Sequence, residues 1–167
     1  AGNMWVNAAE KNGKKGVDDD GNGYVDDVYG WNFVKNSPDP MDDDGHGTHC
    51  AGVIGAIGND KYGIVGVAWK TKIMALKFLD NEGAGTLEDA LKAVDYAIKN
   101  GAKVLSNSWS GGDYSETLKQ AIERSSQAGA IFVAAASNDA SDNDAQPVYP
   151  AGYKIPNVLS VAAINNT

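Results

Sequence analysis

The amino-acid sequence predicts an α/β fold, in which a parallel sheet carries helices on both faces. Two observations lead to this fold class. The chain has 167 residues, 43% of them hydrophobic, which is enough for one domain with a core. From Gly45 onward, short apolar segments alternate with amphipathic segments of helical length. Strands that alternate with helices of this length pair in parallel.

Composition divides the chain into two parts. Residues 1–44 are rich in Gly, Asp, Asn and Pro, which indicates turns and loops rather than regular elements. The predicted helices and strands follow in residues 45–167. We therefore expect one domain over residues 1–167, with an acidic loop region at 1–44 and an α/β core at 45–167.

The first predicted helix begins after Asp44 or Gly45, either of which can cap it. Apolar residues then recur at i, i+3, i+4 and i+7 and form one helical face, made of Cys50, Val53, Ile54 and Ile57. The small residues between them suit close packing on a sheet. The segment KIMALKFL, residues 72–79, is predicted as a buried strand.

Two more helices are expected further along the chain. One covers residues 86–101 and begins with Thr86 and Asp89 as a capping pair. The other begins at Asp113 and ends at Gly129. Its inward face is formed by Leu118, Ala121 and Ile122. The remaining predicted strands are residues 102–108, 130–137 and 157–164.

Charge and hydropathy exclude two classes of partner. The formal net charge of −8 and the sequence pI of about 4.6 leave no basic surface for nucleic acid or for an anionic membrane. No apolar run approaches the roughly 20 residues that a spanning helix needs. We therefore expect neither nucleic acid nor a membrane as a partner.

His46 is a candidate proton acceptor. It falls in the first turn of a predicted helix, where the helix dipole disfavours imidazolium and so favours the neutral ring. His49 lies three residues later, but the glutamate of the zinc-protease motif is missing, and a buried structural role suits His49 better. The aspartates before His46, residues 42–44, could form a second calcium cluster together with Asp39, but a solvated loop is favoured there.

Asn138 follows the predicted strand 130–137, at the carboxyl end where ligands bind in parallel sheets. Taken alone, an asparagine there favours a helix cap or a turn. Near a neutral histidine, its side-chain amide would suit an oxyanion hole, which stabilises the charge that develops on an attacked carbonyl.

An aspartate run near the N-terminus fits the start of a calcium loop. Asp18, Asp20 and Asn22 follow the pattern D-x-D-x-N-G, in which alternate oxygens converge on Ca²⁺. Asp26 stands at the ninth position, and Asp27 or oxygens from elsewhere must complete the shell. The twelfth position carries no glutamate, which excludes an EF-hand proper. A solvated loop is the alternative.

The motif DDDGHGTHCAG, residues 42–52, resembles the histidine motif of the subtilisin-like serine proteases, or subtilases. The segment VAAASN, residues 133–138, is similar to their oxyanion-hole segment. By this resemblance His46 is the general base and Asn138 the oxyanion donor. The resemblance covers nearly the whole chain, and its segments occur in the family's order.

The resemblance also implies a substrate site. Two segments match those between which a subtilase binds an extended peptide as an added strand, namely Gly83, Ala84 and Gly85, and Ser108, Trp109 and Ser110. Trp109 would border the pocket for a substrate side chain. Cys50 resembles the cysteine after the catalytic histidine of thiol-containing subtilases, with a buried small hydrophobe as the alternative.

Two family motifs are absent from the 167 residues, the aspartate motif D-[ST]-G and the nucleophile motif G-T-S-x-[AS]. We therefore expect a subtilase catalytic domain that is incomplete at both ends and inactive by itself. The family further implies bound Ca²⁺, a peptide or protein substrate, a propeptide or complementing fragment, and a secreted or secretory-lumen location.

Two other functions are compared with the protease. A non-catalytic peptide-binding or calcium-stabilised module, a pseudo-protease, stays open, although it would need neither His46 nor Asn138. A flavodoxin-like nucleotide binder is set aside because the motifs G-x-G-x-x-G and G-x-x-x-x-G-K-[ST] are missing.

Overall fold

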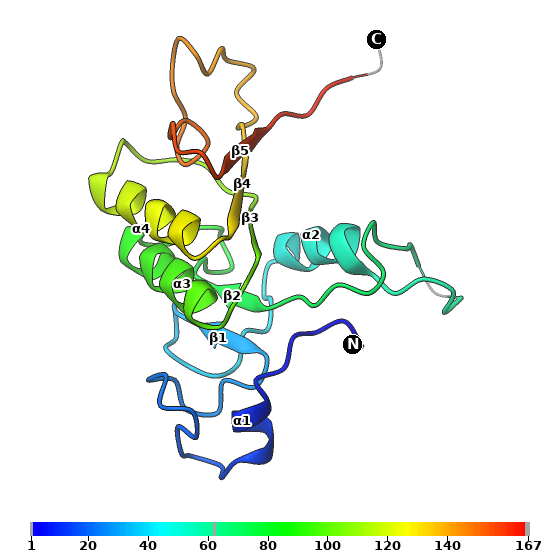
Figure 1. The fold of residues 1–167 in the computed structure, drawn as a ribbon. Coiled ribbons are helices and arrows are strands. Elements are labelled where there is room, and N and C mark those ends of the chain that lie inside the picture. Colours follow the sequence, from blue (N-terminus) through cyan, green and yellow to red (C-terminus); the bar gives the residue numbers. More distant parts are fainter. Residues whose placement is uncertain (1, 62, 166–167) are drawn as a thin grey trace. The chain divides into compact units, whose positions relative to one another are not determined.

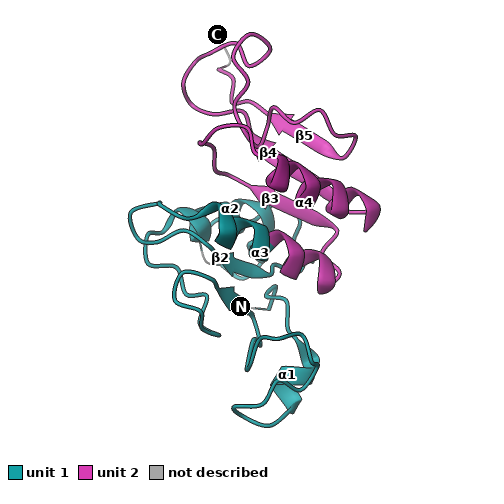
Figure 2. Ribbon diagram, turned by 90° about the vertical axis from the view of Figure 1, so that its left-hand side faces the viewer, with its two compact units in different colours: residues 1–93 teal, residues 94–167 magenta. Residues whose placement is uncertain are grey.

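A computed structural model describes residues 2–61 and 63–165. The chain divides into two compact units, residues 1–93 and 94–167, and the division falls inside helix α3, Leu87–Lys99 (Figure 2). Along the chain, short strands alternate with helices (Figure 1). All strand pairs among the described residues are parallel, which confirms the predicted α/β class.

The sheet of the first unit consists of β1, Gly30–Asn32, and β2, Ala75–Lys77, paired in parallel. Glycine is required at position 30, because its φ is 130° and an added Cβ would lie 1.8 Å from the carbonyl oxygen of Ala75. The aromatic ring of Tyr24 packs edge-on against Trp31 in the core beside this sheet.

Residues 1–44 contain two regular elements that their composition did not indicate, helix α1, Ala8–Asn12, and strand β1. The helix is one short turn, which the Asn7 side chain caps by accepting from the N–H of Ala9. Both elements are shorter than the window over which a hydrophobic period can be detected.

Helix α2, His46–Gly55, begins after the N-cap residue Gly45, as predicted. Its apolar face is more open than the pattern indicated, because Val53, Ile54 and Ile57 are all exposed. The predicted strand 72–79 is also shorter than expected, since only the three residues of β2 form a ladder.

The second unit has a three-stranded parallel sheet in the order β3–β4–β5. Its strands are β3, Val104–Asn107, β4, Ile131–Ala135, and β5, Val158–Val161. Helix α4, Glu116–Gln127, packs against β4. The predicted inward face of α4 is confirmed, because Leu118, Ala121 and Ile122 are buried together with Phe132.

The ends of the two longer helices show which capping predictions hold. The hydroxyl of Thr86 accepts from the N–H of Asp89 at 3.1 Å, which confirms the predicted pair before α3. The N-cap of α4 is Ser115 rather than Asp113, since the Ser115 hydroxyl accepts from the N–H of Leu118. Asp113 lies outside the helix, so that prediction was wrong by two residues.

One face of the β3–β4–β5 sheet carries exposed apolar side chains. The strand register places them on the face that alternates with the buried Leu105 and Phe132. They are Val104, Ile131, Leu159 and Val161.

None of the described helices is long and apolar enough to cross a membrane.

Candidate functional site

The residues selected from the sequence lie in both units. His46, the segment Gly83–Gly85 and the calcium candidates belong to residues 1–93. The segment 108–110 and Asn138 belong to residues 94–167. Each distance given below therefore joins two atoms of the same unit.

His46 is the first residue of α2, and it is exposed. Its backbone N–H donates to Oδ2 of Asp44 at 3.0 Å. Cys50, one turn further along α2, places its Sγ 3.7 Å from His46 Nε2. The imidazole is thus accessible to a reacting group and has a thiol beside it.

The two neighbours of His46 differ from the sequence-based interpretation. His49 is exposed, so the buried structural role predicted for it is wrong. Cys50 is half-buried rather than fully buried. Both residues belong to the first turns of α2, where residues 46–49 are all exposed.

Asp42 binds the turn that precedes His46 through both carboxylate oxygens. Its Oδ1 accepts from the N–H groups of Asp44 at 3.1 Å and Gly45 at 3.0 Å. Its Oδ2 accepts from the N–H of Thr48 at 2.7 Å and from the Thr48 hydroxyl at 2.6 Å. These donors, led by the Gly45 N–H and the Thr48 hydroxyl, hold the pKa of Asp42 well below its usual range.

Asp43 connects the same turn to the end of β2. Its carboxylate pairs with Lys77, which also donates to the carbonyl of Leu79 at 2.7 Å. Lys35 makes a second, exposed ion pair with Asp43 at 3.3 Å. The Lys77 hydrogen bond is the main reason that the pKa of Asp43 is lowered. The carboxylates of Asp42 and Asp43 are therefore both bound by other groups of the protein.

Asn138 is exposed and follows the end of β4. The residue before it, Ser137, has a φ of 75°, a left-handed conformation that is uncommon for a residue with a side chain. The Ser137 hydroxyl donates to the carboxylate of Asp139. Unusual backbone conformations of this kind concentrate at functional sites.

The segment Gly83–Gly85 forms a tight turn after β2. The carboxylate of Asp80 accepts from the N–H groups of Glu82 at 2.9 Å and Ala84 at 3.0 Å, which lowers the pKa of Asp80. The Asp80 N–H donates to the carbonyl of Ala84 at 2.8 Å. Gly83, at the tip, has a φ of 76°. The turn is held by its own aspartate and presents an exposed edge.

The segment 108–110 follows β3. Ser108 borders a hollow of about 190 Å³ at the carboxyl ends of the strands in the second unit. Among the described residues no charged side chain lines this hollow, whose other walls are Ser106, Asn107, Val133, Ala134, Ala135 and Val161. The indole N–H of Trp109 donates to Oδ1 of Asn107 at 3.1 Å, which fixes the ring beside the strand end.

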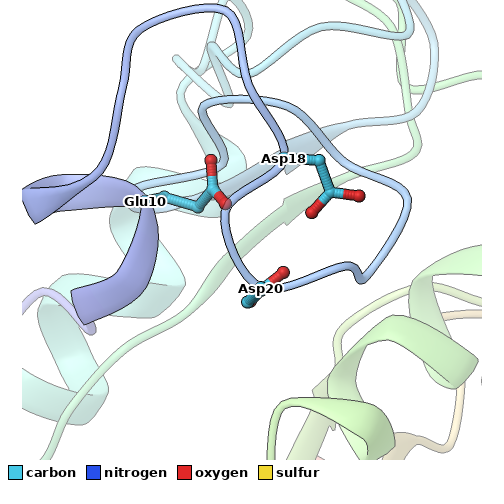
Figure 3. A group of neighbouring side chains, drawn as sticks. All are labelled: Glu10, Asp18 and Asp20. Atoms are coloured by element: carbon cyan, nitrogen blue, oxygen red, sulfur yellow. The ribbon is translucent and has the colours of Figure 1, made fainter.

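Three carboxylates come together in the acidic loop. Glu10 extends from α1 toward Asp18 and Asp20 of the loop (Figure 3). One oxygen from each residue lies within 4.8 Å of the other two. Two ligands of one Ca²⁺ ion can lie up to about 5 Å apart, because each Ca–O distance is 2.3–2.6 Å. The geometry therefore fits a divalent cation bound by oxygen ligands.

The other predicted metal ligands make hydrogen bonds within the same loop. The buried carboxylate of Asp27 accepts from the side-chain amides of Asn7 and Asn22, each at 2.8 Å. The Asp26 carboxylate accepts from the N–H of Gly16 at 2.9 Å. These residues brace the loop around the three carboxylates, and their role as ligands stays a prediction.

Glu10 is the acidic residue that sequence reasoning missed. It is buried, and its two oxygens accept from the N–H of Asp19 at 2.6 Å and of Asp26 at 2.8 Å. Its position before the loop follows no calcium-loop pattern, so only the tertiary approach of α1 reveals it.

Comparisons with known proteins identify the family of the chain. The model of the subtilase family matches residues 6–167. Subtilisin-like protease 1 of Plasmodium vivax is 47% identical over 145 residues, which cover 87% of this chain and 23% of that protein. Thermitase of Thermoactinomyces vulgaris is 43% identical over 136 residues, which cover 81% of this chain and 47% of that protein.

A third relative gives the same picture. Subtilisin-like protease 1 of Plasmodium falciparum, isolate 3D7, is 43% identical over 145 residues, which cover 87% of this chain and 21% of that protein. The chain thus spans only about a fifth to a half of the length of these relatives. The resemblance inferred from the histidine motif is confirmed.

Proposed function

This chain belongs to the subtilase family, and from that premise we propose that the intact protein is a subtilisin-like serine endopeptidase that hydrolyses peptide bonds. The observation that carries the proposal is the family match over residues 6–167. The histidine motif contains His46, which is exposed and is the first residue of α2. An exposed imidazole at that position is accessible to the hydroxyl of a serine nucleophile.

In the proposed mechanism, His46 takes the proton from the serine hydroxyl while the serine oxygen attacks the peptide carbonyl. The same imidazole then returns the proton to the leaving amine. The side-chain amide of Asn138 donates a hydrogen bond to the oxyanion that forms on the carbonyl oxygen. The family supports a peptide or protein as the substrate. By the family resemblance, the segments Gly83–Gly85 and 108–110 would each pair with an extended peptide.

The proposal assigns the nucleophile and the aspartate of the triad to sequence outside these 167 residues, because neither family motif occurs among them. The 167-residue polypeptide alone would then hold a base and an oxyanion donor without a nucleophile. Loss of triad members removes several orders of magnitude of activity. We therefore expect this polypeptide to be inactive by itself unless a companion fragment supplies the serine.

The proposal includes Ca²⁺ as a structural ion at Glu10, Asp18 and Asp20. Hydrogen bonds from backbone N–H groups, above all that of Gly23, lower the pKa of Asp18 and keep it ionised. Within the described residues, neither Glu10 nor these aspartates form an ion pair with lysine or arginine. A cation would offset this uncompensated charge, and calcium is most abundant in a secreted or secretory-lumen location.

Hydrolysis of an unfolded protein by the full-length enzyme tests the catalytic assignments. His46→Ala should lower kcat by about 10⁶, and Asn138→Ala by roughly 10²–10³, magnitudes known from a subtilisin of the same family. His49→Ala, which removes the neighbouring imidazole, serves as the matched control and should cost less than about 10-fold. Equal losses for the two histidine variants would contradict the assignment of His46 as the base.

A further inference from the structure

We propose that Asp42 is a positioning residue for His46, which fixes the first turn of α2 and with it the imidazole. The catalytic consequence of this inference rests on the proposed function. The structural part does not, because it concerns how the chain holds a helix end. The contacts that carry the inference lie on both sides of His46 in the sequence.

The N–H groups at the start of α2 need an acceptor from a residue other than the N-cap. Its N-cap residue is Gly45, which has no side chain, and its first turn contains no acidic residue. The first N–H groups of a helix have no partner within it and need an acceptor. Asp44 accepts from the N–H of His46, and Asp42 accepts from that of Thr48, the third residue of the helix.

The backbone at Gly45 explains how Asp42 reaches the helix. Gly45 has a φ of 107°, so the chain reverses there and the carboxylate of residue 42 returns over the first turn. Oδ1 then accepts from the two N–H groups before His46, and Oδ2 accepts from both donors of Thr48 after it. His46 is therefore enclosed between two pairs of hydrogen bonds to one carboxylate.

The Asp42 carboxylate oxygens accept all four hydrogen bonds. A side-chain amide has only one oxygen, so it cannot accept all four. In Asp42→Asn, one oxygen becomes an NH₂ group, which would face the donors of Thr48 or those of the turn. The variant keeps the size of the side chain and loses two of the four acceptor contacts. Thr48→Val is a narrower change, because it removes only the hydroxyl contact.

Small displacements of a catalytic group are costly, since a shift of about 1 Å lowers rates by about 100-fold. The full-length protein, assayed with a peptide substrate, should show kcat lowered about 10-fold to 100-fold by Asp42→Asn, with KM changed less than about 2-fold. Thr48→Val should lower kcat by a smaller factor, and Thr48→Ser should restore it. Asp39→Asn removes one charge from the same segment and should leave both constants unchanged.

Hydrogen exchange of the same variants separates positioning from general stability. Asp42→Asn should speed exchange at the amides of Gly45 and Thr48 while the amides of α4 keep their protection. Asp39→Asn should not alter either region. Faster exchange throughout the chain, or an equal rise of KM and fall of kcat, would mean that Asp42 only stabilises the fold.

Two results would overturn the inference outright. One is normal exchange at residues 45–48 in Asp42→Asn, and the other is a Thr48→Val enzyme with wild-type kcat and wild-type exchange. A wild-type protein that hydrolyses no peptide would instead refute the proposed function. The exchange measurement would then still decide whether Asp42 holds the start of α2.

Discussion

The chain contains the same pattern D-D-D-G-x-G twice, at residues 18–23 and 42–47, and the two copies have different surroundings. In the first copy, Asp18 and Asp20 gather with Glu10 within 4.8 Å. The aspartates of both copies accept hydrogen bonds, but in the second copy two lysines also form ion pairs with Asp43. The two copies also differ in secondary structure, since the first copy lies in a loop and helix α2 begins within the second, at His46.

Compensation of charge is the physical distinction between the two copies. Lys77 and Lys35 pair with Asp43 of the second copy. No ion pair reaches the first copy within the described residues. Carboxylates that approach without a cation repel one another, so the first copy suits a bound ion and the second does not. An aspartate run alone therefore does not identify a metal site.

Removal of calcium should produce the largest difference between the copies. A site filled at 100 times its dissociation constant stabilises by about 2.7 kcal/mol, so a chelator should lower Tm of the full-length protein by roughly 5–10 °C. Asp18→Asn with Asp20→Asn should abolish the calcium-dependent shift in a thermal melt. Asp42→Asn should keep the shift at its wild-type size, and loss of the shift in that variant would contradict the distinction.

A smaller effect is expected from the lysines of the second copy. The Lys77 side chain is 9% exposed and that of Lys35 is 65% exposed. Lys77→Met removes a buried ammonium that pairs with Asp43 and donates to the Leu79 carbonyl, so it should lower the free energy of unfolding more than the loss of Lys35 does. The matched change Lys35→Met should cost less than about 0.5 kcal/mol. Denaturant titration checks both, and equal costs would show that burial of Lys77 has no role.

The pH dependence of Asp42 should give the smallest effect. Its folded-state pKa is depressed, so its stabilisation is complete above the unfolded pKa of about 3.9 and is lost as the pH falls through the folded value. The stability difference between wild type and Asp42→Asn, about 1 kcal/mol for hydrogen bonds lost from a carboxylate, should therefore be constant from pH 7 to 5 in denaturant titrations. The stability difference should shrink below pH 4. A difference that grows as the pH falls would contradict the lowered pKa of Asp42.

Much of the fold could be predicted from the sequence, because periodic patterns report buried faces directly. The inward residues of α4 and the Thr86 cap of α3 are local signals, and both are confirmed. Strand β1 was missed because three residues give no period, and it forms only through pairing with β2. Tertiary contact, rather than propensity, decides such short elements.

The candidate site could be predicted from the sequence in the same uneven way. The roles proposed for His46 and Asn138 rest on the resemblance of their motifs to those of the family, and they stay predictions. Glu10 joins its cluster through the approach of α1, which no local pattern encodes. The role of Asp42 had one overlooked signal, since a glycine at the N-cap position requires a capping group from elsewhere.

Labelling with a fluorophosphonate probe, followed by intact mass measurement, tests the central claim most directly. We expect the folded full-length protein to gain one probe on a serine outside these 167 residues, and His46→Ala to gain none. The 167-residue polypeptide alone should also stay unlabelled. A folded, calcium-loaded full-length protein that takes up no probe would contradict the protease and leave a non-catalytic peptide-binding module.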